Sequence, residues 1–240
     1  MEDASNSSRT YFDLAKTRLK KLVTRLSRNN DLLQGYDQVI CSYICNGHAE
    51  EVPRKEDVGY PAVNSEGIYY MSDREVIKEQ SATTKLRIVF DASSHARICK
   101  SLNDNLEKGP KLHPNLLDVL IRFRMKAIGM TAGTQQAYLQ IGVSQEDHDA
   151  LRFLGFYEPP DHRCATGKVL EWRMKRVPFG TTASAFLFSA TLCHHLSTAQ
   201  QRTADIMAQS FYVDDLVYGA DSTVEAHRLY DEANMELMKW

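Results

Sequence analysis

The apolar residues near the N-terminus recur at helical spacing. Between residues 11 and 28 they follow one another at three or four positions, and basic residues occupy most of the other face. This pattern predicts a helix with an apolar face made of Phe12, Ala15, Leu19, Leu22 and Leu26. A second helix is predicted over residues 31–46, and the polar residues 1–10 are expected to be a disordered start.

The middle of the chain mixes strand and helix patterns. Proline and glycine mark residues 47–67 as a loop. Strands are predicted at residues 85–93, 137–143 and 150–157, and residues 171–180 alternate and end in a Pro-Phe-Gly turn. Helices are predicted at residues 114–125 and 181–196. Because strands and helices interleave without a strict βαβ order, the expected fold class is α+β.

Two strand-like runs near the C-terminus enclose a pair of acidic residues. The stretch "SFYVDDLVYG" leaves only Asp214 and Asp215 between the runs, which is the spacing of a tight hairpin with both aspartates at the turn. After the hairpin, Ser222 and Glu225 form a capping-box pattern that begins a final helix. The apolar positions expected to face inward on this helix are Ala226, Leu229, Tyr230, Ala233 and Leu237.

The adjacent aspartates allow two interpretations. Aspartate is common in turns, so a solvated turn is the simpler one. Two neighbouring carboxylates repel, however, and a divalent cation would relieve that repulsion. The hairpin alone does not decide between them.

Composition and charge narrow the class of protein. The chain has 240 residues, is 43% hydrophobic and carries a net charge of −2, as a soluble globular protein does. Residues 9–28 nevertheless hold seven cationic side chains against Asp13, which suits either a solvated helix surface or a phosphate contact. The five scattered cysteines favour a reducing, cytoplasmic location, and no apolar run reaches the ~20 residues that span a bilayer.

Several motifs occur in the order that reverse transcriptases use. They are "GHAEEV", "VIKEQSATTKLRIVFDASS", "SLNDNLEKGP", "DALRFLGF", "KRVPFGTTASAFLFSATLCHHL" and "SFYVDDLVYG". From about Tyr11 to Trp240 the chain resembles the reverse transcriptase region of BEL/Pao-type retrotransposon Pol polyproteins. This resemblance implies an RNA-directed DNA polymerase fold with fingers (residues 11–130) and a palm (residues 131–240), ending before the thumb.

The same resemblance implies partners and a metal cofactor. Expected partners are an RNA template, an RNA–DNA or DNA duplex and deoxynucleoside triphosphates. The protease, RNase H and integrase of such polyproteins are absent from this chain, and no membrane is implied. Asp214 and Asp215 would belong to a set of three carboxylates that binds two Mg²⁺ ions, which activate the primer 3′-hydroxyl and hold the triphosphate.

Five further residues match nucleotide-site positions of the family. Lys85 and Arg87 would grip the triphosphate, Tyr138 would block a ribose 2′-hydroxyl, Phe179 would line the pocket, and Lys239 would protonate pyrophosphate. Each also has a simpler explanation. The two strand cations and the lysine near a helix end suit solvated surfaces, and the two aromatic residues suit packing in the core.

One position departs from the family pattern. The first palm motif of the family has an aspartate that this chain, in "AGTQQAYLQ", replaces with Gly133, which is expected to lie on the strand next to the aspartate hairpin. Glycine offers no carboxylate, so the two-metal geometry is expected to fail and polymerase activity to be impaired. The alternatives are a non-catalytic palm that binds nucleic acid or protein, or a non-functional remnant of an element.

Overall fold

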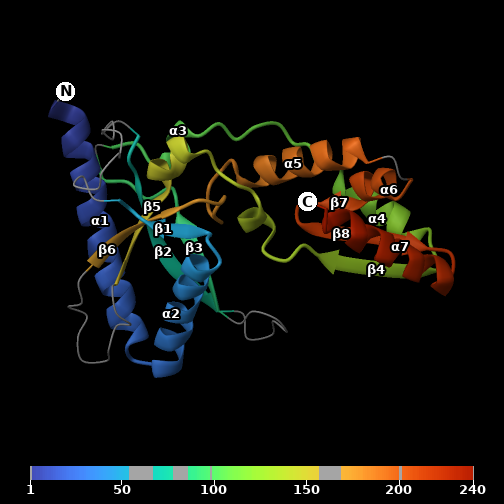
Figure 1. Ribbon diagram of the computed structural model, residues 1–240, viewed down its shortest axis with the longest axis horizontal. Coiled ribbons are helices and arrows are strands. Elements are labelled where there is room, and N and C mark those ends of the chain that lie inside the picture. Colours follow the sequence, from blue (N-terminus) through green and yellow to red (C-terminus); the bar gives the residue numbers. More distant parts are fainter. Residues whose placement is uncertain are drawn as a thin grey trace. The chain divides into compact units, whose positions relative to one another are not determined.

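The computed structural model describes residues 2–53, 67–77, 86–97, 99–156, 169–199 and 202–239 (Figure 1). The chain divides into two compact units, each built from two segments. Unit 1 comprises Met1–Glu107 and Gly142–Thr182, and unit 2 comprises Lys108–Ile141 and Ala183–Trp240. The family resemblance predicts a single boundary between fingers and palm, between residues 130 and 131.

Unit 1 is a five-stranded sheet covered by two long helices. The strands are β1 (Ala49–Glu51), β2 (Tyr70–Ile77), β3 (Leu86–Asp91), β5 (Arg152–Phe156) and β6 (Val169–Met174), in the order β1-β6-β5-β2-β3. Only the β2–β5 pair is parallel. The helices are α1 (Glu2–Leu26), α2 (Asn30–Cys45) and α3 (Leu102–Asn105), with a 3₁₀ segment at Gln145–Leu151.

The two long helices pack against the sheet, and α1 does so through the apolar face that the sequence predicted. Helix α1 contacts β2 and β5, and α2 contacts β3. In α1, Ala15, Leu19, Leu22 and Leu26 are all buried. The side chain of Asn29 accepts hydrogen bonds from the first backbone N–H groups of α2, which fixes where that helix begins.

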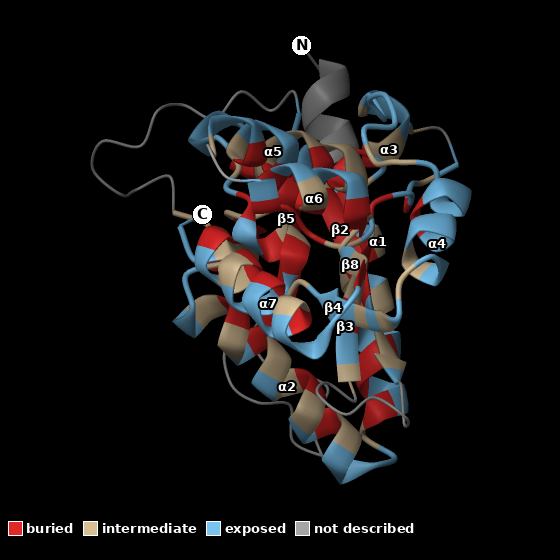
Figure 2. Ribbon diagram, turned by 90° about the vertical axis from the view of Figure 1, so that its right-hand side faces the viewer, coloured by how far each residue is buried: buried red, intermediate tan, exposed pale blue. Residues whose placement is uncertain are grey.

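Unit 2 is a three-stranded antiparallel sheet with helices on both faces. Strand β8 (Asp215–Ala220) lies between β4 (Ile128–Gly133) and β7 (Phe211–Tyr212). The helices are α4 (Leu116–Arg124), α5 (Ser184–Thr198), α6 (Arg202–Ser210) and α7 (Thr223–Leu237), with a 3₁₀ segment at Ala137–Gln140. Helix α4 buries Val119 alone, whereas α7 buries several residues of its predicted apolar face (Figure 2).

Several elements differ from the sequence predictions, among them β1, which lies within the predicted loop at residues 47–67. Helix α1 begins at Glu2, where a disordered start was expected. The predicted strand at residues 137–143 is wrong, because Gln136 adopts a left-handed conformation (φ 52°) and a 3₁₀ turn follows. Ala137, Leu139 and Ile141 are all buried, so their alternation is real although the backbone is not extended. Strand β2 and helix α6 had not been predicted.

No helix in the described part of the chain combines the length and the apolar character needed to cross a membrane.

Candidate active site

The predicted hairpin is present in unit 2. Strands β7 and β8 pair antiparallel, with Tyr212 opposite Asp215. The prediction of a hairpin at this position is therefore confirmed. The prediction that both aspartates form its turn is wrong, because the turn residues are Val213 and Asp214, and Asp215 is the first residue of β8.

The turn has an uncommon backbone conformation. Val213 has φ 59°, and among the described residues it shares a positive φ without being glycine only with Gln136. A positive φ at the first turn residue alone is the pattern of a type II′ turn, which normally places glycine there. A β-branched residue in this region is strained, and such strain clusters at functional sites. Valine is not a residue that such turns favour, so nothing in the sequence indicated that Val213 is one of the two turn residues.

Gly133 lies directly opposite one of the aspartates. Strands β4 and β8 pair antiparallel and place Gly133 beside Asp215, and the backbone N–H of Thr134 donates to the carbonyl oxygen of Asp214 over 2.9 Å. The expectation that Gly133 occupies the neighbouring strand is therefore confirmed. A Cβ atom built on Gly133 would lie 3.3 Å from Oδ1 of Asp215, and the φ of Gly133 is outside the left-handed region. An aspartate at position 133 would therefore begin beside the carboxylate of Asp215.

The donor set of the hairpin suits one magnesium ion. Asp214 is half-buried and Asp215 is exposed. Mg²⁺ prefers oxygen ligands and is commonly held by one or two carboxylates together with substrate phosphates. Among the described residues, no group of three or more His, Cys, Asp or Glu side chains is placed to hold a metal ion. Asp214 and Asp215 could therefore supply carboxylate oxygens to a metal ion, and residue 133 does not supply a third carboxylate.

Tyr138 lies close to the hairpin. It belongs to the 3₁₀ segment Ala137–Gln140. Its ring packs edge-on against that of Phe188, with 6.0 Å between the ring centroids. Burial raises the pKa of its hydroxyl, and the negative charge of Asp214 raises that pKa further. The structure thus brings Tyr138 and Asp214 together, and the tyrosine also contributes to packing.

Lys239 is engaged by a neighbouring carboxylate. Its Nζ atom lies 2.7 Å from Oε2 of Glu236, a residue that is 3% exposed at the end of α7. The other oxygen of Glu236 lies 3.3 Å from Nε2 of His195. The ammonium group therefore has a structural partner in addition to the proton-donor role expected for it.

Arg87, a residue of unit 1 predicted to bind the triphosphate, has a second arginine beside it that the sequence did not indicate. Arg87 is exposed on β3 and stands opposite Val76 of β2, while Arg74 is exposed two residues earlier on β2. Residues opposite each other or two apart share a face of a sheet, so Arg74 and Arg87 point to the same side. Lys85 lies outside the described residues.

Phe179 belongs to a turn fastened to strand β3. Its carbonyl oxygen accepts a hydrogen bond from the N–H of Phe90 over 3.1 Å, and Gly180 has φ 117°. A Cβ atom on Gly180 would lie 1.8 Å from the carbonyl oxygen of Phe90, so only glycine fits there.

The side chain of Asn103 holds the same turn from the other side. It donates to the carbonyl oxygen of Gly180 and to the hydroxyl of Ser93, and it accepts from the N–H of Thr182. The motifs "FDASS", "SLNDN" and "VPFGTT" are therefore parts of one hydrogen-bonded cluster. Sequence reasoning gave Asn103 no role.

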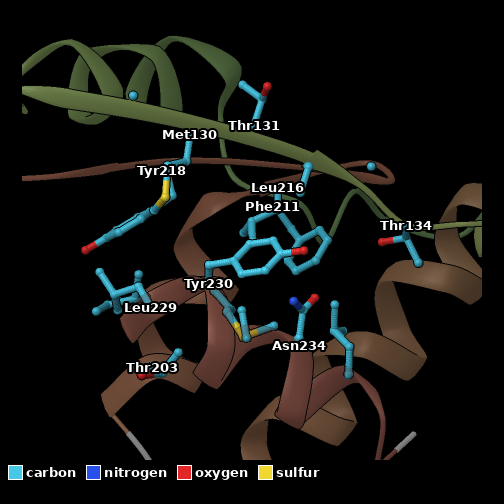
Figure 3. Close-up of a pocket in the computed structure, with 17 residues that line it drawn as sticks. Met130, Thr131, Thr134, Thr203, Phe211, Leu216, Tyr218, Leu229, Tyr230 and Asn234 are labelled. Carbon is cyan, nitrogen blue, oxygen red and sulfur yellow. The ribbon is translucent and has the colours of Figure 1, made fainter. Parts of the chain in front are cut away.

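A cavity lies between the unit 2 sheet and helices α6 and α7. It measures about 410 Å³ and is lined by β4, β8, α6 and α7 (Figure 3). Most of its lining is apolar, with Tyr230 and Asn234 of α7 directed into it in Figure 3. Tyr230 was expected to be an inward residue and is 56% exposed at this cavity. No acidic side chain is among the lining residues, although Gly133 and Thr134 line the cavity and also contact the hairpin aspartates.

The candidate residues divide between the two units. Asp214, Asp215, Tyr138 and Lys239 belong to unit 2, which gathers the possible metal ligands. Arg87 and Phe179 belong to unit 1, as do Arg74 and Asn103.

Comparison with known proteins identifies the fold. No family model and no curated protein matches the chain. Among solved structures, the chain is similar to a foamy viral protease–reverse transcriptase in complex with double-stranded DNA, with a TM-score of 0.61 and 16% sequence identity. The match covers 86% of this chain and 29% of that protein, so this chain spans less than a third of its length. The chain therefore has a mixed α+β, reverse-transcriptase-like fold.

Proposed function

We propose that the chain is the fingers-and-palm portion of a reverse transcriptase from a BEL/Pao-type retrotransposon polyprotein. Unit 1 is the fingers and unit 2 is the palm. Three observations support this assignment: the order of the motifs, the aspartate hairpin paired with β4, and the similarity in fold to the foamy viral enzyme. The expected ligands are a primer–template duplex and deoxynucleoside triphosphates.

Each part of the site has a role in this proposal. Asp214 and Asp215 supply carboxylate oxygens for Mg²⁺, which when bound neutralises phosphate charge during phosphoryl transfer. Arg87, with Arg74 on the same face, supplies fixed positive charge for the triphosphate. Tyr138 is held by Phe188 close to Asp214, where an aromatic ring restricts the space beside the nucleotide sugar.

We further propose that this chain has impaired polymerase chemistry. The observation that supports this most directly is the pairing of Gly133 with Asp215, which puts glycine where a carboxylate would share a metal with the hairpin. Without a shared ligand, the attacking and leaving oxygens are no longer held by one pair of ions. A loss of about 4 kcal/mol of transition-state stabilisation would slow the reaction roughly a thousandfold.

The test compares Gly133→Asp with Gly133→Asn, which has nearly the same shape and no charge. All forms, including the natural chain, carry the same added thumb domain so that they grip duplex equally. Primer extension on an RNA template is measured with Mg²⁺, and Mn²⁺ affinity is measured independently by electron paramagnetic resonance. We expect Gly133→Asp alone to gain extension and to bind Mn²⁺ more tightly.

Each outcome has a distinct meaning. Equal extension by the natural chain and Gly133→Asp would contradict the proposed impairment. Tighter Mn²⁺ binding by Gly133→Asp with no extension, while duplex binding persists, would favour a second function. In that function the palm binds nucleic acid without catalysis.

A further inference from the structure

Helix α1 presents an outer face of cationic side chains. Lys20, Lys21 and Arg28 are exposed, as is Arg9, and Lys16 is half-buried. At 3.6 residues per turn the four side chains that lie on the helix fall within an arc of about 140°, and Arg28 lies in the turn that follows Leu26. We call this group the α1 basic face.

Other cations of α1 are already neutralised. Arg18 forms an ion pair with Asp91 of β3, and Arg25 forms one with Glu75 of β2. These two pairs fasten the helix to the sheet of unit 1. By contrast, no residue of the α1 basic face forms an ion pair with any residue that the structure describes, and the Nζ atom of Lys16 lies over the ring of Phe12, 5.6 Å from its centroid.

The concentration of charge is local. Residues 9–28 have a balance of +6, seven cations minus Asp13, in a chain whose net charge is −2, so the rest of the chain carries −8. Exposed like charges repel one another, and a folded helix that gathers them gains from an anionic partner that neutralises them. Thr17 and Thr24 lie within the same arc and are small, so the surface between the cations is not obstructed.

The opposite face of α1 excludes one class of anionic partner. Leu19, Leu22, Val23 and Leu26 are each at most 4% exposed because they pack within unit 1. A helix that lies in a membrane interface inserts its apolar face among the lipids. The apolar face of α1 is not available for that, so the observations favour a partner that is bound by charge alone.

We propose that the α1 basic face binds the phosphate backbone of a nucleic-acid duplex, at a site separate from the aspartate hairpin. This inference rests on the proposed function, because it adds a second contact for the same duplex. From Arg9 to Lys21 the helix spans about 18 Å, which equals roughly five base steps along a duplex axis, and Arg28 follows in the turn after the helix ends at Leu26. Cations spread over this length suit a repeating phosphate backbone better than a small anion.

The experiment measures how duplex affinity depends on salt. Binding of a labelled RNA–DNA duplex to the full chain is followed by fluorescence anisotropy between about 50 and 200 mM salt, without divalent metal or nucleotide. Each neutralised phosphate contributes about 0.9 to the slope of log affinity against log salt. Lys20→Gln/Lys21→Gln should therefore lower the magnitude of the slope by about 1.8.

Two matched variants make the result specific. Arg202→Gln/Arg228→Gln removes the same charge from exposed positions of unit 2 and should leave the slope nearly unchanged. Lys20→Arg/Lys21→Arg keeps the charge and should preserve the slope, which separates charge from any effect on folding. In addition, Asp13→Asn removes the carboxylate that lies between Arg9 and Lys16 and should tighten binding.

The proposal is overturned if Lys20→Gln/Lys21→Gln changes the slope no more than the unit 2 control, or if the natural chain does not bind duplex at about 50 mM salt. It is also overturned if the lysine variant loses only binding to phosphatidylserine vesicles. A result confined to the lysine variant concerns the α1 basic face alone, whereas failure of the natural chain to bind duplex would also count against the proposed function. Conversely, if primer extension fails, the salt dependence still tests whether the α1 basic face binds duplex.

Discussion

A buried carboxyl group in unit 1 should make the stability of the protein depend on pH. Asp73 of β2 is 8% exposed and accepts a hydrogen bond from the hydroxyl of Tyr36 on α2. Burial raises the pKa of Asp73 from 3.8 to about 6, although the Tyr36 hydrogen bond lowers it in part. Glu75 on the same strand adds a smaller increase through its negative charge.

The sign and size of the effect follow from this shift. Because the folded state holds the Asp73 proton more tightly than the unfolded chain does, the contribution of Asp73 is most favourable below pH 3.8 and is lost as the pH rises through about 6. A shift of about two pKa units corresponds to roughly 3 kcal/mol. Above that range, the ionised and buried carboxylate lowers stability by a constant amount.

Urea unfolding followed by circular dichroism at several pH values between about 4 and 8 would measure this contribution. Asp73→Asn cannot titrate, so the difference in unfolding free energy between the natural chain and the variant should change by about 3 kcal/mol over this range. Tyr36→Phe removes the hydrogen bond that stabilises the charged form and should move the transition to higher pH. Parallel pH profiles for the natural chain and Asp73→Asn would refute the reasoning.

Two further predictions concern the turn of unit 1 and the hairpin of unit 2. Gly180→Ala should destabilise the protein by more than about 2 kcal/mol in urea unfolding, because its Cβ would overlap a β3 carbonyl oxygen, whereas Gly35→Ala in α2 should be neutral or stabilising. Similar small effects for both would contradict the close approach. Asp214→Asn should lower the pKa of Tyr138 in an NMR titration of ring-labelled tyrosine. An unchanged pKa would show that the charge of Asp214 does not act on the Tyr138 hydroxyl.

Much of the fold was predictable because the chain's local patterns agree with its tertiary contacts. The apolar face of α1, most of that of α7, the end of the second helix near residue 46 and the Ser222 cap all appear in the structure. Strand β2 was missed because it holds buried Asp73 and Ser72, whose burial depends on partners elsewhere in the chain. Likewise, Arg152 and Arg173 are buried in the sheet because Asp149 bonds to both, which local patterns do not indicate.

The motifs of the candidate site could be predicted from the sequence, but not the exact turn residues or the side chains that other elements bring to the site. The aspartate hairpin and its pairing with the strand of Gly133 followed from sequence, but the one-residue shift of the turn did not, because it depends on the pairing of Tyr212 with Asp215. Arg74 and Asn103 were missed for the same reason. Their placement comes from strand register and from a turn 77 residues away in the chain, as the bond from Asn103 to Gly180 shows.

The position of Gly133 separates the stability of the fold from its chemistry. Gly133 is exposed, while β4 and β8 are held by backbone pairing and by an inner cluster around Ala220, Ala226 and Leu229. No packed side chain depends on residue 133, so Gly133→Asp should fold normally.

Without metal, repulsion between the carboxylate of Gly133→Asp and that of Asp215 should cost on the order of 1 kcal/mol at the surface. Mg²⁺ or Mn²⁺ should reverse this cost and raise the melting temperature of Gly133→Asp more than that of the natural chain, because a ligand that binds only the folded state stabilises it. Equal metal-dependent shifts for Gly133→Asp and Gly133→Asn would show that position 133 does not share a metal with Asp215, and the argument for impaired chemistry would fail with it.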